Sequence, residues 1–414
     1  MKLKLKLYHL ILIGIVLGIF TGYFFKGITP ILLAPVGEIF MRLLRLLVIP
    51  LVFTSVTLGI VSIGDIKQLG SVSTKTFAYF ILSGFVATII GLTLSQIIKP
   101  GVGYTNAEII NHRHYEVPPS FIDLIVNIAP QNIFESLSKG EILPVIVFAM
   151  LLGVALVEVE SKAKPLISFL EASFSAIMKI TDWIIKLTPI GVFALSANTV
   201  ATLGIKSMFA VFSYFLTVVI GLFIHAVILL PIILKTIGGY SAIELFRKIL
   251  PALAIATPTA SSGAAIPVTM ECLNKNVGVP NRITSFVVPI GTTIDMNGTA
   301  LYQGVAVMFI AQMYGIHLDL FHQAIIVLTA FFASAGAAAV PGAGLVTMVI
   351  ILNAVGVPVE GLSFILAVDR ILDSCRTPVN LWSNSIGAII VAKLEKEKLR
   401  PHETELENIE VKMT

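Results

Sequence analysis

Charged residues are scarce in this 414-residue chain, where Lys, Arg, Asp and Glu together make up 13% of the sequence. A soluble globular domain carries about 25% charged residues, so the deficit excludes an ordinary soluble fold. Cysteine is also rare, with two residues in the chain, which excludes a disulfide framework. The formal net charge of +4 gives no reason to expect a nucleic-acid partner.

Hydrophobic residues account for 56% of the chain, with a mean hydropathy of +0.95. Residues 77–98 run for 22 positions without a charge, residues 207–234 for 28 and residues 320–359 for 40. A helix that crosses a bilayer needs about 20 apolar residues, so these runs predict membrane spans. The longest run has room for two passes. We therefore expect a multi-pass protein of the cell (inner) membrane, with the lipid bilayer as its surroundings.

The amino-terminal apolar run could be mistaken for a signal peptide, but no small-residue cleavage site follows it. A second apolar run begins almost at once, so we interpret residues 9–25 as an uncleaved first span. Lys2, Lys4 and Lys6 precede this span. Positive charge favours the cytoplasmic side, which predicts a cytoplasmic amino terminus. The charged tail over residues 395–414 is expected to be cytoplasmic too.

The first six spans are predicted at residues 9–25, 37–62, 77–98, 122–158, 166–200 and 207–235. The segment over residues 100–120 is polar and contains Gly and Pro, which is typical of a loop. We interpret it as an external loop between the third and fourth spans.

Two tracts of small residues distinguish the carboxyl-terminal part of the chain, namely TASSGAAIPVT at residues 259–269 and ASAGAAAVPGA at residues 333–343. Their prolines, Pro267 and Pro341, lie 74 positions apart. Each proline is followed 28 residues later by an aspartate, Asp295 or Asp369. This matched spacing predicts a repeated unit, in which a helical hairpin enters and leaves the membrane from one side and a full span follows.

The tips of such hairpins need a special environment. Each tract interrupts an apolar stretch near its middle, at residues 243–275 and 320–353. Non-helical backbone at membrane depth survives only inside protein or beside a water-filled cavity. Duplicated Gly/Pro-interrupted segments therefore indicate a transporter binding site. The alternative is that Gly and Ala merely allow close helix packing. The repetition of the spacing favours the binding site.

Four charges lie within eight residues of the last apolar run, in the sequence VDRILDSCRTPVNLWSN at residues 368–384. Helical periodicity places five polar residues on one stripe: Asp369, Asp373, Arg376, Asn380 and Asn384. A charge at the bilayer centre costs about 2.5–3.5 kcal/mol on insertion scales, so these side chains are expected to face the protein interior and to pair. For Asp369, a structural ion pair that locks two helices is the alternative.

Three neighbours of this stripe carry separate expectations. Thr377 flanks the stripe, whereas Arg370 points about 100° away and is interpreted as a snorkelling or structural charge. Pro378 cannot donate to the carbonyl of Ser374, which predicts a locally open helix where the polar groups concentrate.

The preceding span contains the sequence GTTIDMNGTALYQG, with Asp295, Asn297 and Thr299 around Gly298. Polar residues two apart fall on opposite faces of a regular helix, so this pattern predicts an unwound turn. Backbone carbonyls freed there, the Asp295 carboxylate and the Asn297 amide are hard oxygen ligands that suit a small cation.

The motifs DMNGTALYQG, VPGAG and ILDSCRTPVN, after a serine-containing tip, resemble those of the glutamate transporter family of dicarboxylate/amino acid:cation symporters. The resemblance covers the whole chain. It implies an all-α polytopic membrane protein with eight transmembrane helices, two re-entrant helical hairpins and inverted repeats. It also implies a homotrimer that works by an elevator motion.

The resemblance further implies a division of the chain into a scaffold and a transport core. Scaffold spans 1 and 2 occupy residues 1–70, span 3 and the external loop residues 71–121, scaffold spans 4 and 5 residues 122–205, and span 6 residues 206–240. The transport core occupies residues 241–394, with hairpin 1, span 7, hairpin 2 and span 8. The cytoplasmic tail completes the chain at residues 395–414.

Residues of the family's substrate site carry over by position. Arg376 matches the arginine that pairs with the substrate's side-chain carboxylate, and Asp373 matches the aspartate that takes its α-ammonium. A planar guanidinium suits a carboxylate, and an ammonium needs an anion. Positions that hold the α-carboxylate and neighbouring groups fall on Asn380, Thr377, Thr299, Ser261 and Ser262. The second hairpin tip, which closes as the outer gate, falls on Val340, Pro341, Gly342 and Gly344.

The chain departs from the family at its sodium sites. Sodium-coupled members read NMDGT where this chain reads DMNGT, so Asp295 and Asn297 are exchanged. A sodium-ligating aspartate of the last span is Asn384 here, and third-span ligands fall on Phe80, Ser83 and Gly84. Candidate cation ligands are Asp295, Asn297, Asn380, Asn384, Gly291 and Thr293. Asp295 and Asp369 are candidate proton carriers, because a buried carboxyl of raised pKa can carry a proton.

The resulting prediction is a secondary transporter, not an enzyme, that carries acidic amino acids such as glutamate or aspartate. Na⁺ or H⁺ is the expected coupling ion, sodium dependence is expected to be shallow, and no other cofactor is expected. A C4-dicarboxylate or cystine transporter of the same family is the alternative, although a simple dicarboxylate offers no ammonium to Asp373. A channel is disfavoured by the lack of a filter-like loop, and an intramembrane protease by the lack of a G-x-S-x-G elbow.

Overall fold

The structure is a computed structural model, and it describes residues 7–62, 66–103, 131–139, 142–203, 206–335 and 342–399. Within these ranges the chain forms helices and no strand. Most of the predicted external loop lies outside the described residues. So do Val340 and Pro341 of the second small-residue tract, and the tail from residue 400 onward.

The first half of the chain contains α1 (Leu7–Phe24), α2 (Thr29–Leu32), α3 (Ala34–Ser62), α4 (Ile66–Ile98), α7 (Ile133–Lys139), α8 (Ile142–Val159), α9 (Lys164–Lys186), α10 (Thr188–Leu203) and α11 (Lys206–Phe223). A short 3₁₀ segment, η1 (Glu160–Ala163), joins α8 to α9. The helix of α11 continues through π-helical η2 (Ile224–Leu229), α12 (Leu230–Ile233) and π-helical η3 (Leu234–Gly238).

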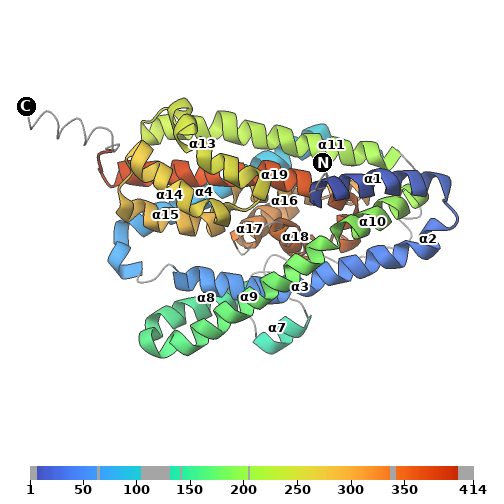
Figure 1. Cartoon of the computed structure of the whole chain (residues 1–414), viewed down its shortest axis with the longest axis horizontal. Helices are drawn as coiled ribbons and strands as arrows, with labels where there is room; N and C mark the ends of the chain where they lie inside the picture. Colours follow the sequence, from blue (N-terminus) through green and yellow to red (C-terminus); the bar gives the residue numbers. More distant parts are fainter. Residues whose placement is uncertain are drawn as a thin grey trace, which may run out of the picture.

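The second half contains α13 (Ala242–Thr259), α14 (Ser262–Glu271), π-helical η4 (Cys272–Val277), α15 (Asn281–Ile294), α16 (Asn297–Met313), α17 (Leu320–Ala335), α18 (Ala343–Ala354), 3₁₀ segment η5 (Val359–Gly361) and α19 (Leu362–Leu394). In Figure 1, α3, α7, α8 and α9 lie along one side of the molecule, and α13 to α19 gather with α4 and α11 on the other. Helices α13, α15 and α16 all pack against α19.

Two helical stretches of the described chain are long and apolar enough to cross a membrane, Gly70–Ile98 and Met208–Gly238. Large apolar side chains also lie on the surface of the molecule. Val16 is 66% exposed, Leu82 65% and Phe169 65%. Extended apolar surface of this kind marks contact with a membrane or a partner. The distribution fits the membrane location predicted from composition.

The predicted single span over residues 166–200 is wrong in detail, because the chain forms two helices there, α9 and α10, that separate at Leu187. Pro189 is the second residue of α10. Proline has no backbone N–H and suits the first turn of a helix, where that group has no intrahelical acceptor. The break therefore follows from Pro189, and the length of the apolar run alone does not predict it.

Both small-residue tracts coincide with interruptions between packed helices. Helices α13 and α14 are separated by Ala260, whose φ of 49° is left-handed, and Ser261. Helices α17 and α18 flank the second tract, and Gly342, with φ 81°, immediately precedes α18. The two helices of each pair pack against each other. Glycine adopts positive φ at little cost, which explains its place at the start of α18.

The unwound turn expected in DMNGT is present between α15 and α16. Asp295 has φ −85° and ψ 59°, and Met296 has φ −94° and ψ 54°, which are not helical values. Helix α16 then resumes at Asn297 and is buried on nearly all sides. Its residues are uncharged and mostly small or apolar, which is typical of a fully enclosed helix. This helix forms the centre of the carboxyl-terminal bundle.

Helix α19 runs for 33 residues and continues through Pro378. Pro378 has no N–H to donate to the carbonyl of Ser374, and the helix nevertheless remains continuous across that position. Helices α13, α15 and α16 pack against it. The polar stripe thus remains on a single regular helix, which fixes the relative positions of its side chains.

The end of α19 is joined to neighbouring helices by ion pairs. Lys75 Nζ of α4 lies 2.7 Å from Glu395 Oε1, and Arg282 Nη2 of α15 lies 3.1 Å from Glu397 Oε1. The hydrogen bond from Lys75 lowers the pKa of the Glu395 carboxyl. These pairs are partly exposed, so each contributes at most about 1 kcal/mol to stability.

Close contact between α1 and α10 depends on glycine. Gly14, Gly18 and Gly22 recur every four residues on one face of α1. A Cβ atom on Gly18 would lie 2.6 Å from the carbonyl oxygen of Phe193, and one on Gly22 would overlap the carbonyl oxygen of Ala197. Small residues at such spacing allow two membrane helices to approach closely.

We expect the substitution Gly22→Ala to destabilise the protein by about 1–3 kcal/mol, because overpacking a close contact costs that much. Thermal unfolding of the detergent-purified protein measures the effect as a lower Tm. Gly27→Ala is the matched control, since no atom lies within 4 Å of a Cβ at that position. Equal Tm values for the two variants would contradict the close contact.

Candidate functional site

Arg376 lies near the middle of α19 and is 1% exposed. Its Nη1 donates to Oδ1 of Asp369 at 3.2 Å, and its Nη2 lies 3.0 Å from Oδ1 of Asp373. The two aspartates precede the arginine by seven and three residues, so the helical repeat brings all three side chains to one face. A buried guanidinium is stable only with such compensation, and two carboxylates supply it.

Tyr302 of α16 holds this group from the opposite side. Its hydroxyl donates to Oδ1 of Asp369 at 2.6 Å. The guanidinium carbon of Arg376 lies 4.1 Å from the centroid of the Tyr302 ring, within range of a cation–π interaction. Tyr302 was not identified from the sequence. The sequence signal that could have found it is its position in the motif DMNGTALYQG, which forms the buried helix α16.

The second oxygen of Asp373 faces the tip of the α17–α18 pair. Oδ2 accepts a hydrogen bond from the backbone N–H of Gly342 at 2.9 Å. The same oxygen lies 3.5 Å from Nη1 of Arg370. The expectation that Arg370 points away from the stripe is therefore wrong. A long arginine side chain can reach a residue three positions further along its own helix, which a projection of Cα positions does not show.

The beginning of α18 closes over Arg376. A Cβ atom on Gly344 would lie 2.9 Å from Nη2 of Arg376 and 2.9 Å from Cγ2 of Thr299. The carbonyl of Gly344 accepts from Nε2 of Gln303 at 3.0 Å, and Nε2 also donates to Oγ1 of Thr347 at 2.8 Å. Gln303 is fully buried and, like Tyr302, was not identified from the sequence.

Asn380 connects α19 to the start of α16. Its Oδ1 accepts from the backbone N–H groups of Gly298 at 2.7 Å and Thr299 at 3.3 Å. Its Nδ2 donates to Oγ1 of Thr299 at 3.1 Å. The first N–H groups of a helix lack intrahelical partners, and here a side chain from another helix satisfies two of them. Thr377, one turn away, donates to the carbonyl of Asp373 at 2.8 Å.

The serines of the first tract lie at the start of α14. Oγ of Ser261 accepts from the N–H of Ala264 at 3.2 Å, which is a helix N-cap. Ser262 is 3% exposed. Helix α14 packs against α19, the helix that carries Arg376.

A second polar cluster surrounds Asp295, which is fully buried. Ser83 of α4 donates to Oδ1 of Asp295 at 3.1 Å. Nδ2 of Asn297 donates to Oγ of Ser383 at 2.6 Å, and the Tyr79 hydroxyl lies 3.2 Å from the same oxygen. Helices α4, α16 and α19 and the unwound turn thus contribute to one buried network.

The oxygens of this region fit a small hard cation. Within the part of the chain that the structure describes, Oδ2 of Asp295, Oδ1 of Asn297 and Oδ1 of Asn384 are buried without a hydrogen-bond partner. Buried polar atoms normally find partners, so three such oxygens are available as ligands. Carboxylate and amide oxygens are hard ligands of the kind that alkali and alkaline-earth cations prefer.

Asn384 is held by its amide nitrogen, and the remaining predicted cation ligands are engaged within the protein. Nδ2 of Asn384 donates to the carbonyl of Val288 at 2.9 Å, and its amide lies against Gly291. The carbonyl of Gly291 accepts from the N–H of Asp295 at 2.9 Å. Thr293 is half-buried, and its hydroxyl donates to the carbonyl of Ile290 at 2.9 Å. The amide oxygen of Asn380 already accepts hydrogen bonds from the first N–H groups of α16.

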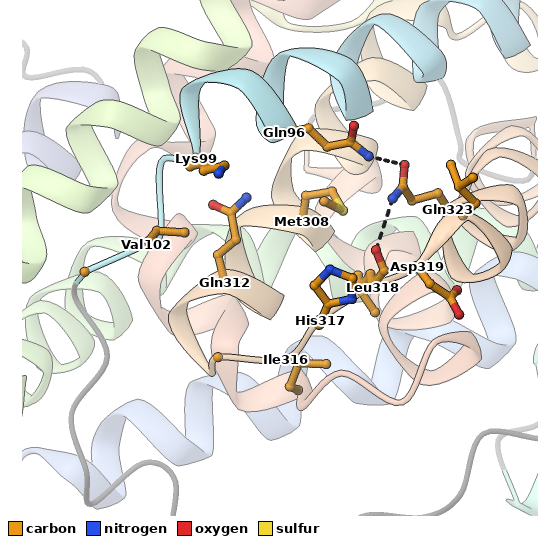
Figure 2. A pocket seen from close by; sticks show the side chains of 13 residues that line it. Gln96, Lys99, Val102, Met308, Gln312, Ile316, His317, Leu318, Asp319 and Gln323 are labelled. Atoms are coloured by element: carbon orange, nitrogen blue, oxygen red, sulfur yellow. Dashed lines mark hydrogen bonds between the residues drawn. The ribbon is translucent and has the colours of Figure 1, made fainter.

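A separate pocket of about 690 Å³ lies at the far ends of α4 and α16 and at the start of α17 (Figure 2). Figure 2 shows Gln96, Lys99, Gln312, His317 and Gln323 around it. None of the residues predicted to bind substrate or cation lines this pocket. The predicted site is instead closed and self-paired, with Arg376 occupied by protein carboxylates.

The charges around Arg376 balance within the protein. Asp369 and Asp373 carry two negative charges, and Arg370 and Arg376 carry two positive charges. All four belong to α19, and three of them are less than 10% exposed. Such a site can exchange one internal ion pair for two ionic contacts with a ligand that has a carboxylate and an ammonium group.

Comparison with known proteins identifies the family of the chain. A sequence profile of the Sodium:dicarboxylate symporter family matches residues 7–394. A Proton/sodium-glutamate symport protein of Geobacillus stearothermophilus is 36% identical over 409 residues, which cover 95% of each chain. The Proton/glutamate-aspartate symporter of Escherichia coli (strain K12) is 35% identical over 412 residues, 95% of this chain and 94% of that protein.

A third relative carries a different substrate class in its name. C4-dicarboxylate transport protein 2 of Mesorhizobium japonicum is 32% identical over 404 residues, 95% of this chain and 90% of that protein. The three matches span nearly the full length of every chain. The chain therefore belongs to the sodium:dicarboxylate symporter family, a family of cation-coupled, multi-pass membrane transporters and not of enzymes.

Proposed function

We propose that this protein is a symporter of acidic amino acids, glutamate or aspartate, driven by a coupled cation. The observation that carries the proposal is the buried Arg376, paired with Asp373 on the same helix face. A ligand with a side-chain carboxylate and an ammonium group matches that pair charge for charge. The names of two relatives, a Proton/sodium-glutamate symport protein and a Proton/glutamate-aspartate symporter, support the same substrate class.

Binding proceeds as an exchange of ion pairs. The substrate's side-chain carboxylate replaces Asp373 on the Arg376 guanidinium, and the released Asp373 carboxylate receives the substrate's ammonium. Asp369 and Tyr302 remain on Arg376 and keep the guanidinium in place. Each charge retains a partner throughout, so the low-dielectric interior never contains an isolated charge, which would cost several kcal/mol.

The ammonium must also compete with the Gly342 N–H for Oδ2 of Asp373, which links substrate binding to the tip of the α17–α18 pair. In the proposed cycle this tip and the substrate alternate on Asp373. Thr299, Thr377, Asn380, Ser261 and Ser262 surround the α-carboxylate. Val340 and Pro341 belong to the same proposed gate, although they lie outside the described residues.

The proposed architecture divides the chain as the resemblance implies. Residues 241–394 form a transport core with two re-entrant hairpins, and the earlier spans form a scaffold in a homotrimer. The core moves relative to the scaffold in an elevator motion. Both termini are cytoplasmic. The apolar surface of α1, α9 and α11 supports contact with lipid or with neighbouring protomers.

The coupling cation is proposed to bind near Asp295. That residue is the one carboxylate in the unwound turn between α15 and α16, and its Oδ2 is without a hydrogen-bond partner among the described residues. A single carboxylate with amide and hydroxyl oxygens holds one Na⁺, or alternatively one H⁺ travels on the carboxyl group. The cluster is too poor in anions for several sodium ions.

Transport of a C4-dicarboxylate is the second candidate function. Arg370 favours it, because its Nη1 lies 3.5 Å from Oδ2 of Asp373 and compensates that charge without an ammonium. The name of the Mesorhizobium japonicum relative agrees with this candidate. Uptake of labelled aspartate, glutamate and succinate into proteoliposomes, with Na⁺ and pH gradients imposed separately, distinguishes the two substrates and the two cations.

We expect Arg376→Ala to abolish uptake of aspartate and glutamate. Loss of one partner from a buried ion pair costs about 3–5 kcal/mol, which corresponds to about a hundredfold loss of affinity or more. Arg376→Lys should fold normally and still lose at least tenfold in apparent affinity, because an ammonium cannot form the bidentate contact. Uptake kinetics in proteoliposomes measure both.

Arg42→Ala is the control for loss of an arginine. Its ion pair with Glu38 is exposed, with side-chain exposures of 74% and 63%, and should contribute little. Aspartate uptake by Arg376→Lys at the wild-type apparent affinity would show that Arg376 is structural.

We expect Arg370→Gln to shift selectivity toward amino acids. Without Arg370, Asp373 has a greater need for a substrate ammonium, whereas a dicarboxylate leaves Asp373 with less compensation. A partly exposed pair contributes about 0.2–1 kcal/mol, so the ratio of aspartate to succinate uptake should rise by about 1.4- to fivefold. An unchanged or lower ratio would contradict competition for Asp373.

We expect Asp295→Asn to abolish or greatly weaken the dependence of uptake on Na⁺ or on pH, whichever the wild-type protein shows. The double variant Asp295→Asn/Asn297→Asp keeps one carboxylate in the turn, and should retain a cation dependence with a changed midpoint. Uptake rates over a series of Na⁺ concentrations at fixed pH, and the reverse, provide the measurement. A steep, cooperative Na⁺ dependence that survives Asp295→Asn would show that the coupling site lies elsewhere.

A further inference from the structure

Ser383 occupies a central position in the cluster around Asp295, although its residue type carried no prediction. It is fully buried on α19, between the substrate-site residue Asn380 and the end of that helix. Its Oγ accepts a hydrogen bond from Nδ2 of Asn297 at 2.6 Å and lies 3.2 Å from the hydroxyl of Tyr79. One hydroxyl therefore contacts residues of both α4 and α16.

The direction of the hydrogen bond between Ser383 and Asn297 is set by chemistry. An amide nitrogen can only donate, so Oγ of Ser383 is the acceptor. The Asn297 amide is consequently held by Nδ2, and its Oδ1 is turned away from Ser383. In the described part of the chain that Oδ1, like Oδ2 of Asp295, has no hydrogen-bond partner.

We propose that Ser383 is a positioning residue for the coupling Na⁺: its hydroxyl holds the Asn297 amide by the nitrogen, and so keeps Oδ1 of Asn297 and Oδ2 of Asp295 available as cation ligands. The inference rests on the proposed cation coupling and names a residue on which that coupling depends.

Removal of the hydroxyl changes what the Asn297 amide can do. A buried N–H donor without an acceptor is costly, so the amide is driven to find another partner. The Asp295 carboxylate is the neighbouring acceptor. Once the Asn297 amide donates to this carboxylate, the carboxylate oxygen is hydrogen-bonded within the protein and attracts Na⁺ less strongly. Sodium affinity then falls without loss of any direct ligand.

Ser385 provides a matched control on the same helix. It is also fully buried, but its Oγ donates to the carbonyl of Leu381 of α19 at 2.8 Å. This is the ordinary local bond of a serine within a helix. Ser383 and Ser385 are therefore alike in residue type, burial and helix, and differ in whether the hydroxyl reaches the Asp295 cluster.

The experiment measures sodium binding without substrate. Thermal unfolding of the detergent-purified protein is followed over a series of NaCl concentrations, with choline chloride added to constant ionic strength. A ligand that binds the folded state raises Tm with its concentration. We expect a sodium-dependent rise in Tm for wild-type and Ser385→Ala. For Ser383→Ala, the midpoint of the rise should require at least tenfold more Na⁺, and Ser383→Thr, which retains a hydroxyl, should restore it.

An unchanged sodium midpoint in Ser383→Ala would overturn the proposal, as would an equal shift in Ser385→Ala. A wild-type protein that Na⁺ does not stabilise at all would also overturn it. In that case the proposed symport would still stand if a pH gradient drives aspartate uptake. Conversely, absence of acidic amino-acid uptake would overturn the proposed function and leave a Ser383-dependent sodium midpoint in place.

Discussion

A guanidinium group enclosed by protein is the constraint on which the carboxyl-terminal bundle depends. Arg376 is 1% exposed, so its charge must be neutralised within the molecule. Asp369 and Asp373 do this from the same helix, and Tyr302 covers the remaining face from α16. The small side chain of Gly344 allows α18 to close over the group. Helix α19 stays regular, and its neighbours adapt to the charge that it carries.

The proposed substrate site and the proposed cation site are joined by the first turn of α16. Asn380 binds the N–H groups of Gly298 and Thr299 in that turn. Asn297 of the same turn binds Ser383, and Asp295 precedes the helix. In the proposed cycle, a shift of the unwound turn toward a cation moves the groups that Asn380 holds. Two sites that share one turn can influence each other through it.

Helical periodicity was sufficient to predict the polar stripe of α19, because α19 is regular over its whole length. The unwound turn was predictable too, since Asp295, Asn297 and Thr299 cannot share a face of a helix. Side-chain reach was not predictable: Arg370 extends along α19 to Asp373. Neither was the continuity of α19 through Pro378. Ser383 lacks a distinctive residue type, and only its neighbours across three helices reveal its contacts.

In DMNGT the carboxylate stands at position 295 and the amide at position 297. This order leaves the composition of the turn the same as in NMDGT but changes its electrostatics. Asn297 is the first residue of α16, where the positive end of the helix dipole would stabilise a carboxylate. Asp295 instead directly follows α15, and its N–H bonds back to Gly291 at that helix's carboxyl end. The negative end of a dipole disfavours an anion there. A carboxylate in this position depends more strongly on an external positive charge, so the proposed coupling links cation binding to the conformation of the turn through the location of Asp295.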